Sequence, residues 1–104
     1  MPNRRPQQIA RRIEQIKAQL CAIDAMRPGS LTRQYKDPTH QRGAYYQLSY
    51  TREMKSRTDY VPRHCLREVR RQTGNYKRFK ALISEWVALS IEQSRLALQR
   101  LHKP

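Results

Sequence analysis

The run Gly43-Ala44-Tyr45-Tyr46-Gln47-Leu48-Ser49-Tyr50-Thr51 decides the fold. Tyr46, Leu48 and Tyr50 alternate with more polar residues, which is typical of a half-buried β-strand rich in aromatic residues. The short connection Arg52-Glu53-Met54 leads to a second predicted strand, Lys55–Val61, and Ser30–Lys36 predicts a third. We therefore expect a three-stranded antiparallel sheet over residues 30–61, with a loop over residues 37–43 marked by a proline and a glycine.

Helices are predicted before and after these strands. Residues 7–26 carry apolar residues at alternating spacings of four and three, and Pro28-Gly29 ends the pattern. The seam consists of Ile9, Ile13, Ile16, Leu20 and Ile23. Residues 64–101 are also helix-like, with a kink or break expected at Gly74. We expect a mostly helical α+β fold in one domain, residues 1–104, with residues 81–101 antiparallel to the N-terminal helix.

The composition restricts the class of protein. The chain has 104 residues, with 22 Lys and Arg against 8 Asp and Glu, a formal net charge of +14. No stretch approaches the roughly 20 apolar residues that cross a bilayer, and no apolar segment of a signal peptide follows Arg4 and Arg5. Two cysteines are too few for a disulfide framework. We expect a cytoplasmic protein that binds a polyanion, with no membrane contact and no small-molecule substrate.

Half of the net positive charge lies in one segment. Residues 52–80 carry a net charge of +7, whereas residues 81–104 carry +1. A solvated basic face would give a similar pattern, but this concentration favours contact with a phosphate backbone. Three strands followed by a helix also resemble small modules that place strands in the major groove of DNA. The basic residues expected at a nucleic-acid interface are Lys55, Arg57, Arg63, Arg67, Arg70, Arg71, Lys77 and Arg78.

The tyrosines allow two interpretations. Exposed aromatic rings stack on bases, but Tyr46, Tyr50 and Tyr60 fit a small core with their hydroxyl groups at its rim. Tyr45 differs because it lies on the polar side of its strand, beside Gln47 and Ser49. Tyr45 is therefore added to the expected nucleic-acid interface.

The second half of the long helix has more apolar residues than one partner helix covers. Surplus apolar surface often marks an interface, here Leu82, Ile83, Trp86, Val87 and Leu89. Three alternatives remain open: a homodimer with four helices, docking to a larger protein, or coverage by the sheet and the N-terminal helix.

Catalysis and metal binding receive little support. The eight acidic residues are dispersed among basic ones, whereas a metal-dependent nuclease needs clustered carboxylates. Cys65 follows His64 directly, and neighbours on a helix do not face each other, so we expect a partly buried structural cysteine. The histidines and cysteines show no close ligand spacing. We expect no enzyme activity, no cofactor and no metal.

Several segments together resemble a family of small bacterial proteins of unknown function, often encoded beside transposases and other mobile-element genes. The resemblance covers residues 8–98, and its most specific part is the run Gly43–Thr51. Its other parts are Gly29-Ser30-Leu31, Gln34-Tyr35, Lys55-Ser56, Tyr60-Val61, Val69-Arg70, Asn75–Phe79 and Glu85-Trp86-Val87. Family members commonly carry two or three cysteines and a histidine where this chain has Lys36–Arg42, with His40 alone. The resemblance implies a fold and a genomic setting, and no established activity.

These observations favour a non-enzymatic nucleic-acid-binding accessory protein of a mobile element, acting on DNA rather than RNA and associated with the nucleoid. The alternative is a protein-interaction scaffold, or a subunit that docks to a larger complex, including a ribonucleoprotein, through the apolar C-terminal helix.

Overall fold

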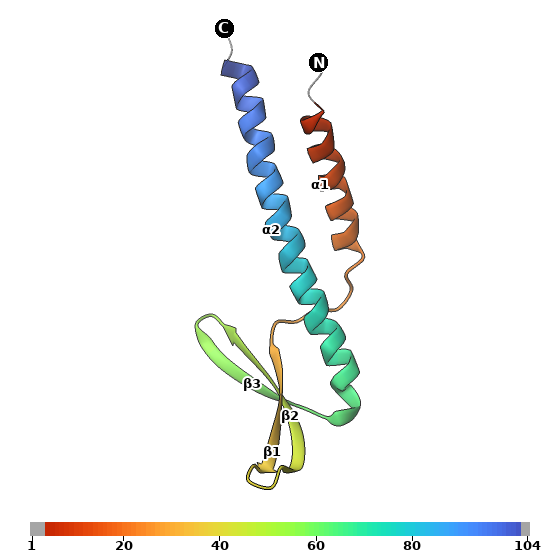
Figure 1. Ribbon diagram of the computed structural model, residues 1–104, viewed down its shortest axis with the longest axis vertical. Coiled ribbons are helices and arrows are strands. Elements are labelled where there is room, and N and C mark those ends of the chain that lie inside the picture. The colour runs from red at the N-terminus through yellow and green to blue at the C-terminus, as the bar shows by residue number, and fades with distance from the viewer. Residues whose placement is uncertain (1–3, 103–104) are drawn as a thin grey trace. The chain divides into compact units, whose positions relative to one another are not determined.

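The computed structural model describes residues 4–102 and confirms the α+β fold (Figure 1). The elements follow in the expected order: a helix, three strands and a long helix. Their bounds are α1 Arg5–Cys21, β1 Ser30–Asp37, β2 Arg42–Arg52, β3 Lys55–Val61, the 3-10 turn η1 Arg63–Cys65 and α2 Leu66–His102. The chain divides into two compact units. Residues 4–24 and 78–102 form the helical pair, and residues 25–77 form the sheet unit.

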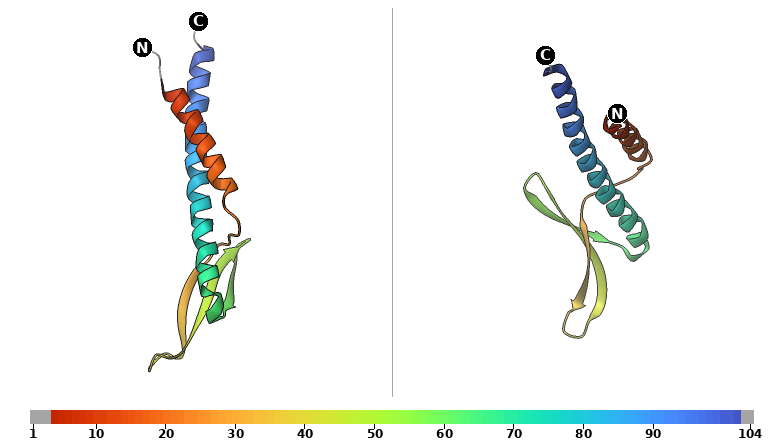
Figure 2. Two further views of the ribbon diagram at one scale, coloured as in Figure 1. Left: turned by 90° about the vertical axis from the view of Figure 1, so that its right-hand side faces the viewer. Right: turned by 45° about the horizontal axis from the view of Figure 1, so that its top comes forward.

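The helical pair is antiparallel, as predicted (Figure 2). Arg5 near the start of α1 donates two hydrogen bonds to Glu92, and Arg12 donates two to Glu85, all between 2.6 and 2.7 Å. The hydrogen bonds from the guanidinium groups lower the pKa of both carboxyl groups. Lys17 lies 5.6 Å from the ring centre of Trp86. The core between the helices is small, and its buried residues are Ile9, Ile13, Ile16 and Leu82.

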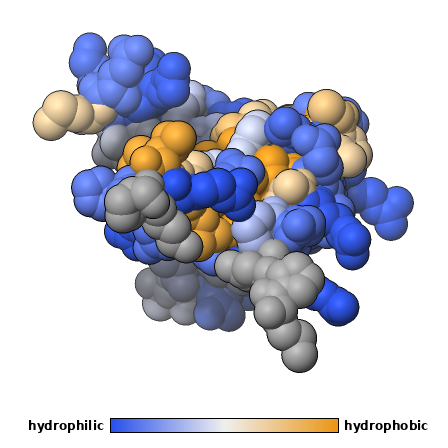
Figure 3. Space-filling view, turned by 90° about the horizontal axis from the view of Figure 1, so that it is seen from above, coloured by the Kyte–Doolittle hydropathy of each residue, from blue (hydrophilic) through white to orange (hydrophobic). Residues whose placement is uncertain are grey.

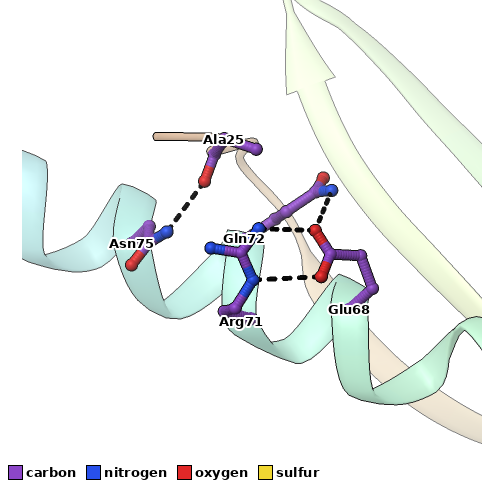
Figure 4. A network of polar contacts seen from close by, with 5 residues as sticks. All are labelled: Ala25, Glu68, Arg71, Gln72 and Asn75. Atoms are coloured by element: carbon purple, nitrogen blue, oxygen red, sulfur yellow. Dashed lines mark hydrogen bonds and ion pairs between the residues drawn. The ribbon is translucent and has the colours of Figure 1, made fainter. Parts of the chain in front are cut away.

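The first helix ends five residues earlier than the predicted residue 26, so Ile23 lies outside the helix and Leu20 is only half-buried. The reason lies in the following segment. The Ala25 carbonyl accepts a hydrogen bond from the Asn75 side chain at 2.8 Å (Figure 4). The Arg27 amide donates to the Gln72 carbonyl at 3.3 Å. These contacts hold residues 25–27 in a non-helical conformation against α2, and the chain leaves the helix after Cys21.

The sheet has the order β1-β2-β3 with both pairs antiparallel. Leu31 lies opposite Leu48 in β1 and β2, and Tyr46 lies opposite Val61 in β2 and β3. The expected loop over 37–43 is shorter, since β1 reaches Asp37 and β2 begins at Arg42. Glu53 and Met54 form the second turn with φ of 53° and 65°, so two residues in the left-handed region connect β2 and β3.

The two sides of the sheet differ. Leu48 and Val61 are buried, and directly opposite residues share a side, so Tyr46, Leu48 and Val61 define the packed face. Arg27 supports this face from the segment before β1. Its guanidinium group donates to Asp59 at 2.7 Å and lies 5.1 Å from the Tyr50 ring centre. The alternate positions define the open face: Ser30, Thr32, Gln34 and Lys36 in β1, Gly43, Tyr45, Gln47, Ser49 and Thr51 in β2, and Ser56, Thr58 and Tyr60 in β3.

The long helix is one uninterrupted element from Leu66 to His102, so the expected break at Gly74 does not occur. A glycine costs about 1 kcal/mol relative to alanine in a helix interior, which the helix tolerates. Asn75, the second residue of the supposed interruption, instead fastens the segment before β1 through Ala25. Gly74 is exposed, and a Cβ atom there would meet no atom within 4 Å.

Gly29 has a strict packing requirement, and Gly29→Ala tests it. Its φ is +145°, and a Cβ atom would lie 2.6 Å from Cδ1 of the fully buried Leu48. The backbone conformation and the clash each cost roughly 1–3 kcal/mol, so we expect a loss of about 3 kcal/mol in the free energy of unfolding. Urea denaturation measures this loss. Gly74→Ala is the matched control and is expected to be neutral or stabilising by up to about 1 kcal/mol.

Candidate nucleic-acid interface

The start of α2 presents basic side chains to solvent. Arg63 lies in η1, and Arg67, Arg70 and Lys77 lie in the first four turns of α2; all four are exposed. None of the four forms an ion pair with any residue in the described range 4–102. Their charges are therefore available to an anion.

Arg71 behaves differently from these neighbours. Its guanidinium group donates to Glu68 at 2.7 and 3.0 Å, and the Gln72 amide donates to the same carboxylate at 3.0 Å (Figure 4). Glu68 thus neutralises one of the residues predicted to contact nucleic acid. The pair is exposed and spaced by three residues, so it is weak enough to exchange partners.

A groove lies between β1 and α2 within the sheet unit. The groove has a volume of about 630 Å³. One wall consists of residues 29–33, which are Gly29 and the first four residues of β1, together with Tyr46 of β2. The other wall consists of Arg70, Thr73, Gly74 and Lys77 of α2. We call it the cation groove because Arg33, Arg70 and Lys77 line it and no carboxylate does. Three like charges around one opening repel each other, and a bound anion would remove this repulsion.

Arg33 is held in position at this groove. Its guanidinium carbon lies 5.7 Å from the Tyr35 ring centre and 5.9 Å from that of Tyr46, both on the packed face. These cation–π contacts restrict the side chain before any ligand arrives. Arg33 was missed in the sequence analysis, although its position between Leu31 and Tyr35 predicts that it shares their side of β1.

The end of the β2–β3 hairpin carries a second group of cations, the hairpin-tip cluster Arg52, Lys55 and Arg57. Lys55 lies directly opposite Arg52, and Arg57 follows two residues later on the same side. All three are exposed, and like charges directly opposite each other destabilise a hairpin. The predicted residues Lys55 and Arg57 therefore lie together, with Arg52 as a third member.

The nine predicted residues do not share one surface. Tyr45 lies on the open face, opposite the side that carries Lys55 and Arg57. Arg78 belongs to the helical pair rather than the sheet unit. The expectation that Tyr60 is a core residue is wrong. Tyr60 is 67% exposed on the open face, because Val61, the next residue, fills the core position.

The predicted partner interface is only partly exposed. Leu82 is 5% exposed and belongs to the core of the helical pair, which excludes it from an interface, and Leu89 is half-buried. Ile83, Trp86 and Val87 line an apolar groove along α2 together with Ser90, Ile91, Ser94 and Arg95. Its apolar line continues with Leu98 and Leu101, both exposed and both absent from the predicted set. Figure 3 shows hydrophobic surface between the hydrophilic side chains in that view.

Residues 4–102 contain neither a metal site nor a membrane-spanning helix. No group of three or more His, Cys, Asp or Glu in this range could hold a metal ion. His40 contacts Asp37 at 2.9 Å, Cys65 is half-buried as expected, and Cys21 is exposed. No helix in the range is long and apolar enough to span a membrane.

No known protein family matches the chain, and neither a curated protein nor a solved structure does.

Proposed function

We propose that this chain is a non-enzymatic nucleic-acid-binding accessory protein whose sheet unit contacts the phosphate backbone. The cation groove carries the proposal. It combines Arg33, Arg70 and Lys77 around one opening without a carboxylate. Thr73 and Gly74 on the α2 side are small, so a ligand can approach the helix backbone there. Arginine and lysine side chains bind phosphate oxygens well, and a backbone that the phosphate can approach closely adds to this binding.

The charge balance of the sheet unit supports a polyanion over a small anion. Residues 25–77 contain twelve Lys and Arg and four Asp and Glu, a net charge of +8. Three of the four carboxylates are engaged: Asp59 with Arg27, Glu68 with Arg71, and Asp37 with His40. The cation groove and the hairpin-tip cluster keep their charges, so several phosphates along one strand could be contacted together.

Duplex DNA is the proposed ligand, in the setting of a mobile element and a nucleoid location. The reason for this choice is the resemblance carried by Gly43–Thr51 to proteins encoded beside transposases. Small modules that place strands in the major groove share the arrangement of three strands and a helix. RNA is the competing nucleic acid.

A salt series of binding measurements tests the proposal. Fluorescence anisotropy with a labelled 30-base-pair duplex is expected to give binding that weakens steeply with salt. With six phosphate contacts the logarithm of the association constant would fall with a slope of about −5 against the logarithm of salt concentration. A single strand and a hairpin RNA serve as comparison ligands. The absence of binding to all three at 50 mM salt would contradict the proposal.

A second candidate function is protein binding through the apolar groove of α2. Val87, Ile91, Leu98 and Leu101 are between 48% and 81% exposed, which is costly for a monomer. We propose a second copy of the chain as the occupant. The helical pair buries few residues, and a second pair would complete a four-helix bundle.

The sequence of the groove suits self-association. Ser90 and Ser94 are small and lie near the middle of the exposed line, where two copies of α2 could cross closely. An antiparallel crossing at that point would bring Val87 of one copy near Leu98 of the other. Apolar residues then meet apolar residues on both sides of the crossing.

A further inference from the structure

The open face of the sheet has a composition that solvent exposure does not explain. Lys36 is the one charged residue among the strand positions of this face, all of which the structure describes. Charged residues make up 29% of the whole chain, and exposed surfaces usually carry a larger share than the average. The face instead presents hydroxyl and amide groups.

No element of the sheet unit packs on this face. Side-chain contacts on this face join its own members: Gln34 with Thr32 and Ser49 with Thr58, both at 3.4 Å, and Thr32 with the Gln47 carbonyl. These contacts are long, so a ligand can replace them at little cost. Tyr60 is 67% exposed, and with Tyr45 it lines a shallow pocket beside Lys36 and Ala44.

We infer that the open face reads base edges in the major groove of duplex DNA, an inference that rests on the proposed function. Gln34 and Gln47 lie on neighbouring strands, and glutamine pairs with the N6 and N7 groups of adenine through two hydrogen bonds. Thr32, Thr51 and Thr58 offer hydroxyl groups to bases and methyl groups to thymine. An uncharged face with these groups distinguishes base pairs, whereas a charged face would attract phosphates of any sequence.

The dimensions of the sheet fit this groove. A major groove about 12 Å wide admits two neighbouring strands, whose axes lie about 4.8 Å apart, so β1 and β2, which carry Gln34 and Gln47, could enter it together. Cations lie at the rim of the sheet, although Lys36 alone projects from the open face and Arg33, Arg52 and Lys55 project from the packed side. Lys36 lies at one end, Arg52 and Lys55 lie at the end of the β2–β3 hairpin, and the cation groove follows the outer edge of β1.

Selection from a random duplex library, followed by binding measurements on the selected and a scrambled 30-base-pair duplex, tests the inference. The Gln34→Ala/Gln47→Ala variant is expected to lose about 10-fold or more of the preference for the selected duplex, since one two-bond contact is worth about 1–3 kcal/mol of discrimination. Its affinity for the scrambled duplex and its salt slope are expected to stay unchanged. Gln93→Ala/Gln99→Ala on exposed α2 positions is the matched control and should keep the preference.

The isosteric variant Gln47→Glu keeps the shape of the central strand if the double variant folds poorly, and it is also expected to lower the preference. Methylation of guanine N7 in the selected duplex should interfere with binding, because N7 lies in the major groove. An unchanged preference in folded Gln34→Ala/Gln47→Ala or Gln47→Glu would overturn the inference and leave the proposed function intact. Tighter binding to a single strand, through stacking on Tyr45 and Tyr60, would do the same. Binding to no nucleic acid would overturn both.

Discussion

Replacing Arg33, Arg70 and Lys77 together by glutamine is expected to weaken binding to duplex DNA at least about 100-fold. These side chains line one groove, and none of them is neutralised by a carboxylate of the lining. If each phosphate contact contributes about 1 kcal/mol, three contacts correspond to about two powers of ten in affinity. The salt slope should also become shallower by about 2.7, because each lost contact removes roughly 0.9. Fluorescence anisotropy over a salt series measures both quantities.

Two control proteins separate a specific groove from general attraction to a strongly basic chain. Arg4→Gln/Arg11→Gln/Arg100→Gln removes the same charge from exposed positions of the helical pair, and it is expected to lower affinity less than about threefold. Lys103, another cation near this end of the chain, lies outside the described residues. Arg33→Lys/Arg70→Lys retains the charge of the groove and should restore most of the affinity. Equal losses in both glutamine variants would mean that net charge alone drives binding. Circular dichroism verifies that each variant is folded.

The sequence predicts the strands well because their signal is local. Alternation in Gly43–Thr51 needs only neighbouring residues, and the register then follows from the two-residue turn. The end of α1 was not predictable in the same way. It depends on the hydrogen bonds that Ala25 accepts from Asn75 and that Arg27 donates to Gln72, and both partners lie far away in the sequence. The predicted break at Gly74 was wrong for a related reason, because the packing of neighbouring residues keeps α2 continuous at this position.

The candidate site was predicted in parts. The basic character of α2 follows from composition, but the assignment of sheet faces failed at Tyr60. Alternation leaves open which side of β3 is packed, and the pairing of Val61 with Tyr46 decides it. The apolar residue Val61 could have corrected the placement of Tyr60 in the core. Val61 lies on the same side of β3 as Arg57 and Asp59, so this side, and not the side of Tyr60, is the packed one. The cation groove joins residues about 40 positions apart, so it requires the fold.

Val87→Glu/Leu98→Glu is expected to convert a dimer into a monomer. Val87 and Leu98 are 54% and 60% exposed in the single chain, on the line of α2 that the apolar groove follows. Burying an aliphatic side chain contributes about 1.5–3 kcal/mol, and four such side chains would lie in a symmetric interface. Four buried carboxylates would oppose association instead, so the dissociation constant should rise at least about 1,000-fold. Sedimentation equilibrium between 1 and about 100 μM measures it.

Ala10→Glu/Ala18→Glu is the matched control, because it adds the same charge to exposed positions of α1, away from the apolar groove. This control should remain a dimer. Val87→Ser/Leu98→Ser provides a milder test if the glutamate variant loses helix content, and it should still weaken association about 100-fold. DNA binding by the sheet unit is expected to persist in a monomeric variant, with loss of any cooperativity between two copies on one duplex. A wild-type chain that stays monomeric at 100 μM, or an unchanged dimer of Val87→Ser/Leu98→Ser, would exclude the second copy. A larger protein would then be the remaining occupant, and co-purification from nuclease-treated extract would be expected to depend on Val87 and Leu98.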